Sequence, residues 1–295
     1  MEFRTIVDIP DPGFRIEPCE EMLFVGSCFA TEIGRRFQEE GFPVAVNPFG
    51  TMYNPASILH TIQRVGGGAK TVFLTLGTNH VYRLKETGEI VDNCEKRPQS
   101  LFAEEELSVE TCADYLQQAI ALLREKNPDV RIVLTVSPIR YRKYGYHASQ
   151  LSKATLLLAA DLVCNGQTRT DTDSINRMGG QTCQKSPDSP CQSVAYFPAY
   201  EIVNDELRDY RFYKPDMLHP SDQAVEYIWQ RLSETYLSAE AKAFIQEWAP
   251  LKAALNHKPF DAESEEYKAF MHKTMLKVEA LTKKISYLCI LRLKD

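Results

Sequence analysis

The 295-residue chain has no long apolar run and no cluster of one charge. No stretch approaches the ~20 consecutive apolar residues that a membrane-spanning helix needs. Residues 1–13 lack a basic segment followed by an apolar one, so they do not resemble a signal peptide. The net charge is −6 and no basic tract is present, which argues against a nucleic-acid partner. We therefore expect a cytoplasmic protein that binds neither membranes nor nucleic acid.

Motifs for metals and nucleotides are also missing. The eight cysteines form no Cys-x-x-Cys pair, and no Cys/His cluster has the spacing of a zinc site. Without a signal peptide, free thiols are the expectation. No Gly-x-Gly-x-x-Gly motif or P-loop follows the first expected strand, which disfavours a nucleotide-binding protein.

What the sequence does contain is an alternation of short apolar runs and helical segments. The expected strands are residues 22–26, 44–46, 71–76, 130–136 and 194–197. The expected helices are residues 30–40, 55–65, 104–126 and 150–163. A last helix is expected to have Pro220 at its first position and to end near residue 237. Near-continuous apolar strands separated by helices indicate a parallel sheet buried on both faces. We expect an α/β fold of the flavodoxin-like, doubly wound type with five strands, which binds ligands beyond their carboxyl ends.

Two segments do not fit this core. Residues 165–193 are rich in Gly, Ser, Thr, Asp, Gln and Pro, a composition that predicts a mobile insertion. Residues 240–284 have the pattern of one or two polar helices. We expect a domain over residues 1–238 and a C-terminal helical extension over 239–295 that packs on the domain or forms a homodimer.

A serine and an Asp-x-x-His sequence follow two of the expected strands. Ser27 lies at a strand-to-helix turn, where backbone N–H groups favour negative charge. Asp216 precedes His219 by three residues, so its carboxylate can reach one imidazole nitrogen while the other remains available. Together they predict the nucleophile, orienting group and base of a serine hydrolase. The alternatives are that Ser27 only caps the helix, that Cys28 is the nucleophile, or that Asp216 and His219 are ordinary turn residues.

Other residues near the strand ends are candidates for the oxyanion hole and for substrate binding. The N–H groups of Ser27 and Gly50 and the side-chain amide of Asn79 can converge on an oxyanion, unless Gly50 and Asn79 are plain turn residues. The substrate-binding candidates are Tyr53, Tyr82, Arg83, Arg140 and Lys153. Their alternatives are tyrosines packed on the sheet and charged residues paired at the surface.

Six colinear motifs carry a family resemblance. They are Gly-Ser-Cys-Phe-Ala at 26–30, Asn-Pro-Phe-Gly-Thr-Met-Tyr-Asn-Pro at 47–55, Leu-Gly-Thr with Val-Tyr at 76–82, Leu-Ser-Lys-Ala-Thr-Leu at 151–156, Tyr-Phe-Pro-Ala-Tyr-Glu at 196–201 and Asp-x-x-His-Pro-Ser at 216–221. In this order they resemble the GSCFA-domain family, a branch of the SGNH/GDSL hydrolase superfamily, over about residues 22–237. The resemblance implies the same fold, a catalytic triad of Ser27, Asp216 and His219, an oxyanion hole completed by Gly50 and Asn79, and no metal or organic cofactor.

The chain departs from these relatives at three positions. Ser27 follows Gly26 without the aspartate of Gly-Asp-Ser, and His80 follows Asn79 in place of aspartate. Tyr141 stands where GSCFA relatives carry a histidine, so it is a further substrate-binding candidate. The resemblance implies a serine esterase or O-acyl hydrolase acting on a small acyl ester, such as an acetyl group on a carbohydrate. The alternatives are an O-acyltransferase with the same triad and a weakly active or inactive binding protein.

Overall fold

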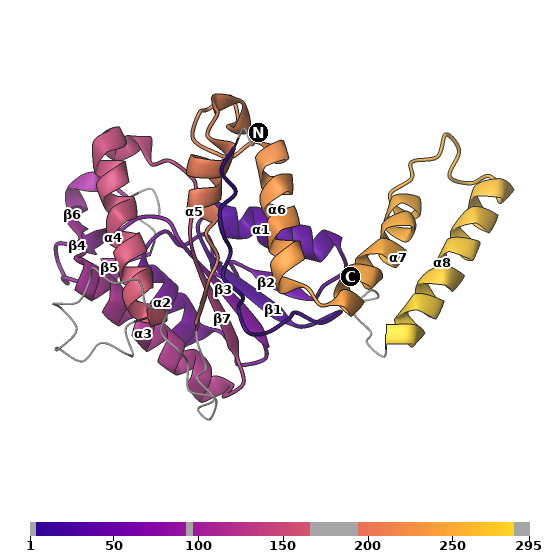
Figure 1. The fold of residues 1–295 in the computed structure, drawn as a ribbon, viewed down its shortest axis with the longest axis horizontal. Coiled ribbons are helices and arrows are strands. Elements are labelled where there is room, and N and C mark those ends of the chain that lie inside the picture. Colours follow the sequence, from indigo (N-terminus) through magenta and orange to yellow (C-terminus); the bar gives the residue numbers. More distant parts are fainter. Residues whose placement is uncertain (1–3, 93–96, 166–193, 286–295) are drawn as a thin grey trace.

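Five parallel strands make the central sheet, in the order β2-β1-β3-β7-β8. Their bounds are β1 (Met22–Gly26), β2 (Val44–Val46), β3 (Thr71–Leu76), β7 (Arg131–Val136) and β8 (Ala195–Tyr196). The computed structural model describes residues 4–92, 97–165 and 194–285, and its helices lie on both faces of this sheet (Figure 1). The strand order is that of flavodoxin-like folds, which confirms the predicted fold class.

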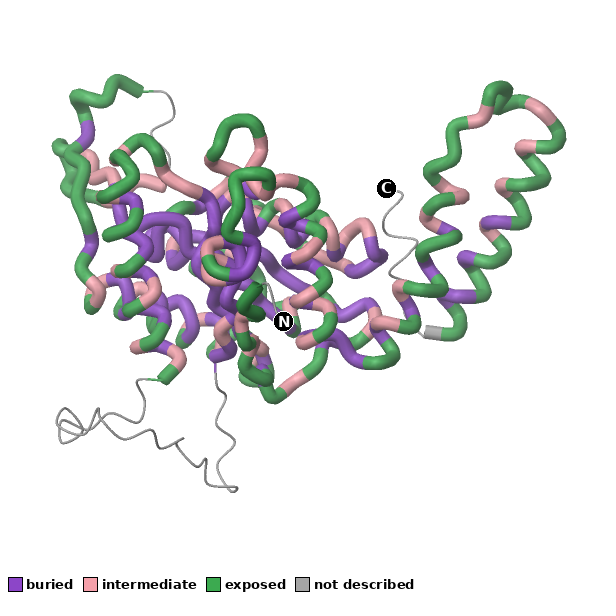
Figure 2. Tube along the Cα trace, turned by 45° about the horizontal axis from the view of Figure 1, so that its top comes forward, coloured by how far each residue is buried: buried purple, intermediate pink, exposed green. Residues whose placement is uncertain are grey.

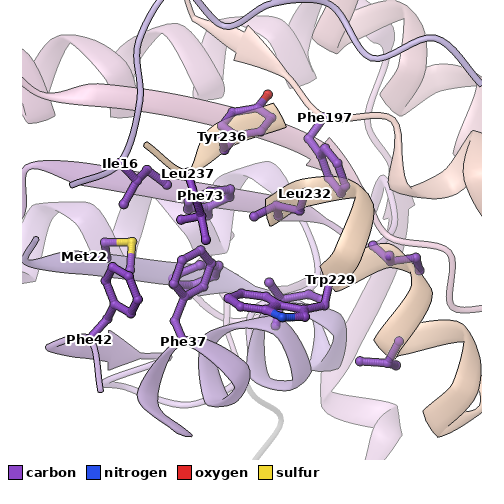
Figure 3. Close-up of a cluster of buried hydrophobic side chains, with 14 of the residues drawn as sticks. Ile16, Met22, Phe37, Phe42, Phe73, Phe197, Trp229, Leu232, Tyr236 and Leu237 are labelled. Atoms are coloured by element: carbon purple, nitrogen blue, oxygen red, sulfur yellow. The ribbon is translucent and has the colours of Figure 1, made fainter. Parts of the chain in front are cut away.

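Strand side chains alternate between two hydrophobic layers. The helices α1 (Cys28–Glu39) and α6 (Asp222–Tyr236) cover one face of the sheet. The other face is covered by α2 (Pro55–Arg64), α3 (Val109–Lys126) and α4 (Gly145–Asn165). A short helix, α5 (Ala199–Glu201), follows β8. Figure 3 shows the aromatic layer against α1 and α6, where the rings of Phe37 and Trp229 meet edge to face at 4.7 Å. Phe73 of β3 lies in the same layer, while its neighbour Leu74 packs on the opposite face.

A second, antiparallel sheet of three strands was not predicted. It has the order β5-β4-β6, with bounds β4 (His80–Leu84), β5 (Ile90–Val91) and β6 (Phe102–Glu106). The predicted helix over residues 104–126 is therefore wrong at its start, because residues 102–106 pair with β4 and the helix begins at Val109 after its N-cap Ser108. The predicted position of Pro220 inside the last helix is also wrong, since Ser221 caps α6 and Pro220 precedes it.

The C-terminal residues form a helical hairpin of α7 (Ala239–Leu255) and α8 (Glu265–Ile285), as the predicted helical extension requires. Figure 2 shows the hairpin extending from the rest of the molecule, with exposed residues along both of its helices. α7 docks on the end of α1, where the Trp248 indole donates to the carbonyl oxygen of Glu39 at 2.9 Å and Lys252 pairs with Glu40 at 2.7 Å. The predicted insertion over 165–193 falls, apart from Asn165, outside the described residues. The division at residue 238 stays a prediction.

Within the described ranges, no helix is long and apolar enough to cross a membrane. The same ranges hold no group of three or more His, Cys, Asp or Glu side chains placed to bind a metal ion.

Candidate active site

The turn between β1 and α1 requires glycine and buries the serine that follows it. Gly26 has a φ of +145°, and a Cβ there would lie 2.1 Å from the carbonyl oxygen of Thr75 on β3. Ser27 has no exposed surface, and its Oγ accepts the N–H of Phe29 at 3.3 Å. Ser27 is therefore the N-cap of α1, which is the alternative that the sequence left open. Its role as nucleophile stays a prediction.

Cys28 is the first residue of α1 and is partly exposed. Its Sγ lies 3.5 Å from the Oη of Tyr53, and the Tyr53 ring meets the Tyr141 ring edge to face at 5.9 Å. Burial, together with the contact to Cys28, raises the pKa of Tyr53 to about 12, so this hydroxyl keeps its proton at neutral pH. Of the two candidate nucleophiles on the turn, only Cys28 has exposed surface.

The Asp216–His219 turn has the geometry of an oriented base. Oδ1 of Asp216 accepts the N–H groups of Leu218 and His219 at 2.8 and 3.0 Å, and Oδ2 lies 2.6 Å from Nδ1 of His219. The two backbone bonds and then the imidazole contact lower the pKa of Asp216 to about 2, so the carboxylate is charged at neutral pH. Because Nδ1 faces the carboxylate, Nε2 is the nitrogen available for proton transfer.

Contacts to two other elements hold this turn near α1. The backbone N–H of Arg140, after β7, donates to the Leu218 carbonyl oxygen at 3.1 Å. The backbone N–H of Lys214 donates to the His219 carbonyl oxygen at 2.8 Å, and the Lys214 ammonium lies 3.4 Å from the carboxylate of Glu32 on α1. Since Glu32 is one helical turn after Cys28, the Lys214 contact ties the segment that carries His219 to the first two turns of α1.

The three predicted oxyanion donors are already used inside the protein. The N–H of Ser27 donates to Thr75 O at 3.2 Å, and the N–H of Gly50 donates to Asn47 O at 2.9 Å. The amide of buried Asn79 donates to the Leu107 carbonyl oxygen at 2.8 Å. These hydrogen bonds give no support to an oxyanion hole built from Ser27, Gly50 and Asn79.

A buried lysine lies beneath the strand ends, where the sequence analysis expected a substrate-binding or surface residue. Nζ of Lys153 donates to the carbonyl oxygens of Gly77 and Ser137, both at 2.7 Å, and lies 5.0 Å from the centre of the Tyr141 ring. Burial lowers the pKa of Lys153 to about 7. A sequence feature that could have predicted this burial is the position of Lys153 three residues before Leu156, which places both on the buried face of α4.

The remaining substrate-binding candidates divide into two groups. Tyr82 and Arg83 lie on β4 and are engaged within the small sheet, where Tyr82 donates to Glu104 at 3.2 Å and Arg83 pairs with Glu105 at 2.9 Å. Tyr53, Arg140 and Tyr141 lie beside the β1–α1 and Asp216–His219 turns, as described above. The structure therefore brings three of these five remaining candidates together and leaves the two on β4 outside.

Family comparison supports the fold and the motif order. The model of the GSCFA family matches residues 21–72 and 63–232. The chain belongs to the GSCFA family. A second model, for the C-terminal domain of GSCFA domain proteins, matches residues 248–293, which includes most of the hairpin. The comparison with curated proteins gave no match.

Several solved structures resemble this GSCFA protein at low identity. A protein of Streptococcus pneumonia, provisionally described as a platelet activating factor, is 16% identical, with 74% of this chain and 84% of that chain covered and a TM-score of 0.43. A carbohydrate esterase family 3 protein from Talaromyces cellulolyticus is 10% identical, with 77% and 99% covered and a TM-score of 0.38. An acetyl esterase mutant bound to acetate is 11% identical, with 77% and 99% covered and a TM-score of 0.39. Similarity at this level carries no argument about the reaction.

Proposed function

We propose that this GSCFA protein is an ester hydrolase in which His219, oriented by Asp216, is the general base for a nucleophile on the β1–α1 turn. The observation that carries the proposal is the 2.6 Å contact between Oδ2 of Asp216 and Nδ1 of His219. A carboxylate in this position fixes the tautomer of the imidazole and stabilises the imidazolium that forms during attack. The same carboxylate holds the turn through two backbone hydrogen bonds, so the base is positioned before substrate binds.

The reaction needs a group that attacks the ester carbonyl and a site for the negative charge that develops. The N-terminus of α1 supplies the positive end of the helix dipole at this place. Ser27 is the nucleophile that the superfamily resemblance implies, and Cys28 is the alternative on the same turn. The proposal of an acyl hydrolase holds for either residue.

The proposed substrate is a small acyl ester, with an acetyl group on a carbohydrate as the first candidate. The family resemblance is the support for this class. Arg140, which lies over the rings of Tyr146 and Tyr213 at 4.4 and 5.4 Å, and Tyr53 are the side chains proposed to contact it. Cytoplasmic location and the absence of an organic cofactor remain parts of the proposal.

The first test compares hydrolysis of p-nitrophenyl acetate by the wild type, His219→Ala and Asp216→Asn. Both variants should lose on the order of 10³-fold or more in kcat/KM, because the base and its orienting group act as one unit. Asp216→Asn retains an oxygen that can accept the backbone N–H groups, so the turn should stay in place. Thermal unfolding of each variant verifies that it folds.

A matched control is available in a second His–Asp pair. His60 on α2 lies 2.7 Å from Asp92, so His60→Ala removes the same kind of contact away from the proposed site. This variant should hydrolyse the ester at the wild-type rate. An inactive wild type across a panel of acetyl and longer acyl esters, or equal rates for all four proteins, would overturn the proposal and favour a binding protein.

A further inference from the structure

We propose that Arg140 is a positioning residue of this site. Its guanidinium group holds the backbone of Met217, and it thereby keeps Asp216 and His219 in the geometry that proton transfer needs. This inference rests on the proposed function and adds a residue to it, whichever residue of the β1–α1 turn is the nucleophile. It depends on the backbone conformation of Met217, on two hydrogen bonds from Arg140 and on the contacts that fix Arg140 itself.

Met217 lies inside the Asp216–His219 turn and has a left-handed backbone conformation, with a φ of +59°. This conformation costs free energy for a residue with a Cβ, and asparagine, aspartate and histidine adopt it more readily than methionine does. The Met217 side chain is 42% exposed, so its burial contributes little to holding the backbone. A strained residue persists where surrounding contacts fix it, and here the turn that contains it brings Oδ2 of Asp216 within 2.6 Å of Nδ1 of His219.

Arg140 supplies two such contacts from a different element. Its Nη1 donates to the carbonyl oxygen of Met217 at 3.1 Å, and its backbone N–H donates to the carbonyl oxygen of Leu218 at 3.1 Å. The first bond fixes the peptide group that follows the strained residue, so it acts on the left-handed conformation itself. Because the donor is charged, this bond is stronger than one between neutral groups.

The guanidinium group of Arg140 is itself restrained by two aromatic rings. It lies 4.4 Å from the centre of the Tyr146 ring on α4 and 5.4 Å from that of the Tyr213 ring. Tyr213 forms an antiparallel bridge with Pro220, so its ring belongs to the loop that carries the Asp216–His219 turn. Cation–π contacts of this kind favour one position of an otherwise flexible side chain. A guanidinium group carries several N–H donors, so the bond to the turn leaves room for the substrate contact proposed above.

The segment that carries Arg140 is bonded on both sides of it. Before it in sequence, the carbonyl oxygen of Ser137 accepts a hydrogen bond at 2.7 Å from Nζ of the buried Lys153. After it, the backbone N–H of Tyr141 donates to Oγ of Ser149 at 3.2 Å. Both partners belong to α4, which packs on the sheet. Arg140 is therefore a fixed point against which the turn is held.

Kinetics of the full-length protein with p-nitrophenyl acetate test this role. Arg140→Met keeps the backbone N–H and an apolar stem but has no donor for the Met217 carbonyl oxygen. We expect kcat to fall about tenfold, as for the loss of a hydrogen bond from a charged donor, while KM changes less than about twofold. Arg140→Ala should show the same loss. Arg97→Met is the matched control, because it removes a guanidinium group that lies 5.1 Å from the Phe102 ring of the small sheet, and it should match the wild type.

A second substitution separates positioning from substrate contact. Asparagine adopts the left-handed conformation more readily than methionine, so Met217→Asn should lessen the need for the Arg140 bond. We expect Arg140→Met to lower kcat about tenfold in the wild-type background and less than about threefold in the Met217→Asn background. Loss of a contact that Arg140 makes only with substrate would cost the same factor in both backgrounds, because that contact is independent of Met217.

Thermal unfolding of each variant verifies that it folds, so that a loss of kcat can be assigned to the turn. Wild-type kcat in Arg140→Met, a rise in KM alone, or an equal loss in both backgrounds would overturn this inference, while loss of activity in His219→Ala would keep the proposed function. An inactive wild type, or full activity in His219→Ala, would overturn the proposed function and this inference with it.

Discussion

At the residue scale, side chains that are adjacent or alike in sequence have different environments in this protein. Ser27 and Cys28 share one turn, yet the first is buried as a helix cap and the second is partly exposed. Lys153 resembles a surface lysine in sequence but is buried between the ends of β3 and β7. Because it binds two carbonyl oxygens, it ties those strand ends together directly beneath the Tyr141 ring.

Lys153 should make the free energy of unfolding depend on pH. Its pKa is about 7 in the folded protein, below the ordinary 10.5, because of burial. Between these values the unfolded chain binds the additional proton, so stability should rise as pH increases, by at most ~1.4 kcal/mol per pH unit. Urea denaturation at pH 7, 8 and 9 should show this slope in the wild type and its loss in Lys153→Met.

The control for this measurement is another lysine bonded to carbonyl oxygens. Lys126 is exposed and donates to the carbonyl oxygens of Ile62 and Val65, both at 2.6 Å. Lys126→Met should keep the wild-type dependence on pH. Equal slopes for the wild type and Lys153→Met would show that the buried ammonium group is not the cause.

At the element scale, close packing of β1 on β3 fixes the turn that opens the site. Gly26 ends β1 in register with Thr75, and its N–H donates to the side chain of Asn47 at 2.9 Å. The chain then enters α1 directly, with Ser27 as cap and Cys28 as first helical residue. The position of the candidate nucleophiles therefore depends on the glycine that ends β1.

Gly26→Ala should disrupt this turn. The new Cβ would lie 2.1 Å from Thr75 O at a φ that L-residues rarely adopt, so we expect a loss of about 2 kcal/mol or more in the free energy of unfolding. Gly66→Ala is the control, because a Cβ there would have no described neighbour within 4 Å. Urea denaturation and ester hydrolysis of both variants test the prediction; wild-type stability of Gly26→Ala would refute it.

At the scale of the whole molecule, the C-terminal hairpin is joined to the domain through α7. Phe244 meets the Phe42 ring edge to face at 5.9 Å, and Trp248 donates to Glu39 O. On α8, by contrast, the large apolar side chains of Phe270 and Leu276 are exposed. The homodimer through these helices stays a prediction, and the mass of the full chain by light scattering would test it.

Removing the Trp248 anchor should release the hairpin from the domain. Trp248→Ala deletes a side chain that is only 4% exposed, and we expect a cost of about 3–5 kcal/mol to the docking of α7. Limited proteolysis should cut α7 or α8 faster, while ester hydrolysis is retained because the proposed site lies on other elements. Phe260→Ala, at a fully exposed aromatic residue, is the control and should cleave as the wild type does.

Predictions from local sequence patterns were correct where neighbouring residues of one element share the same surroundings. The apolar runs over 22–26, 44–46 and 71–76 are strands with those bounds. The first and third are buried along their whole length, as central parallel strands with continuous apolar residues are expected to be. The start of the helix predicted at residue 104 was wrong because glutamates favour helices, whereas residues 102–106 are held as a strand by pairing with β4. That pairing partner lies about twenty residues earlier, beyond the range of local periodicity.

In the candidate site, too, local spacing predicted some features and packing between distant elements set the others. The sequence by itself determined the family, the flavodoxin-like fold class and the Asp216–His219 contact, since a three-residue spacing in a turn brings those side chains together locally. Only the tertiary structure decided that Ser27 is buried while Cys28 is partly exposed, that the predicted oxyanion donors bond to carbonyl oxygens of the protein, and that Lys153 is buried beneath the Tyr141 ring. Those properties depend on which atoms of distant elements surround a group, and packing across the sheet sets them.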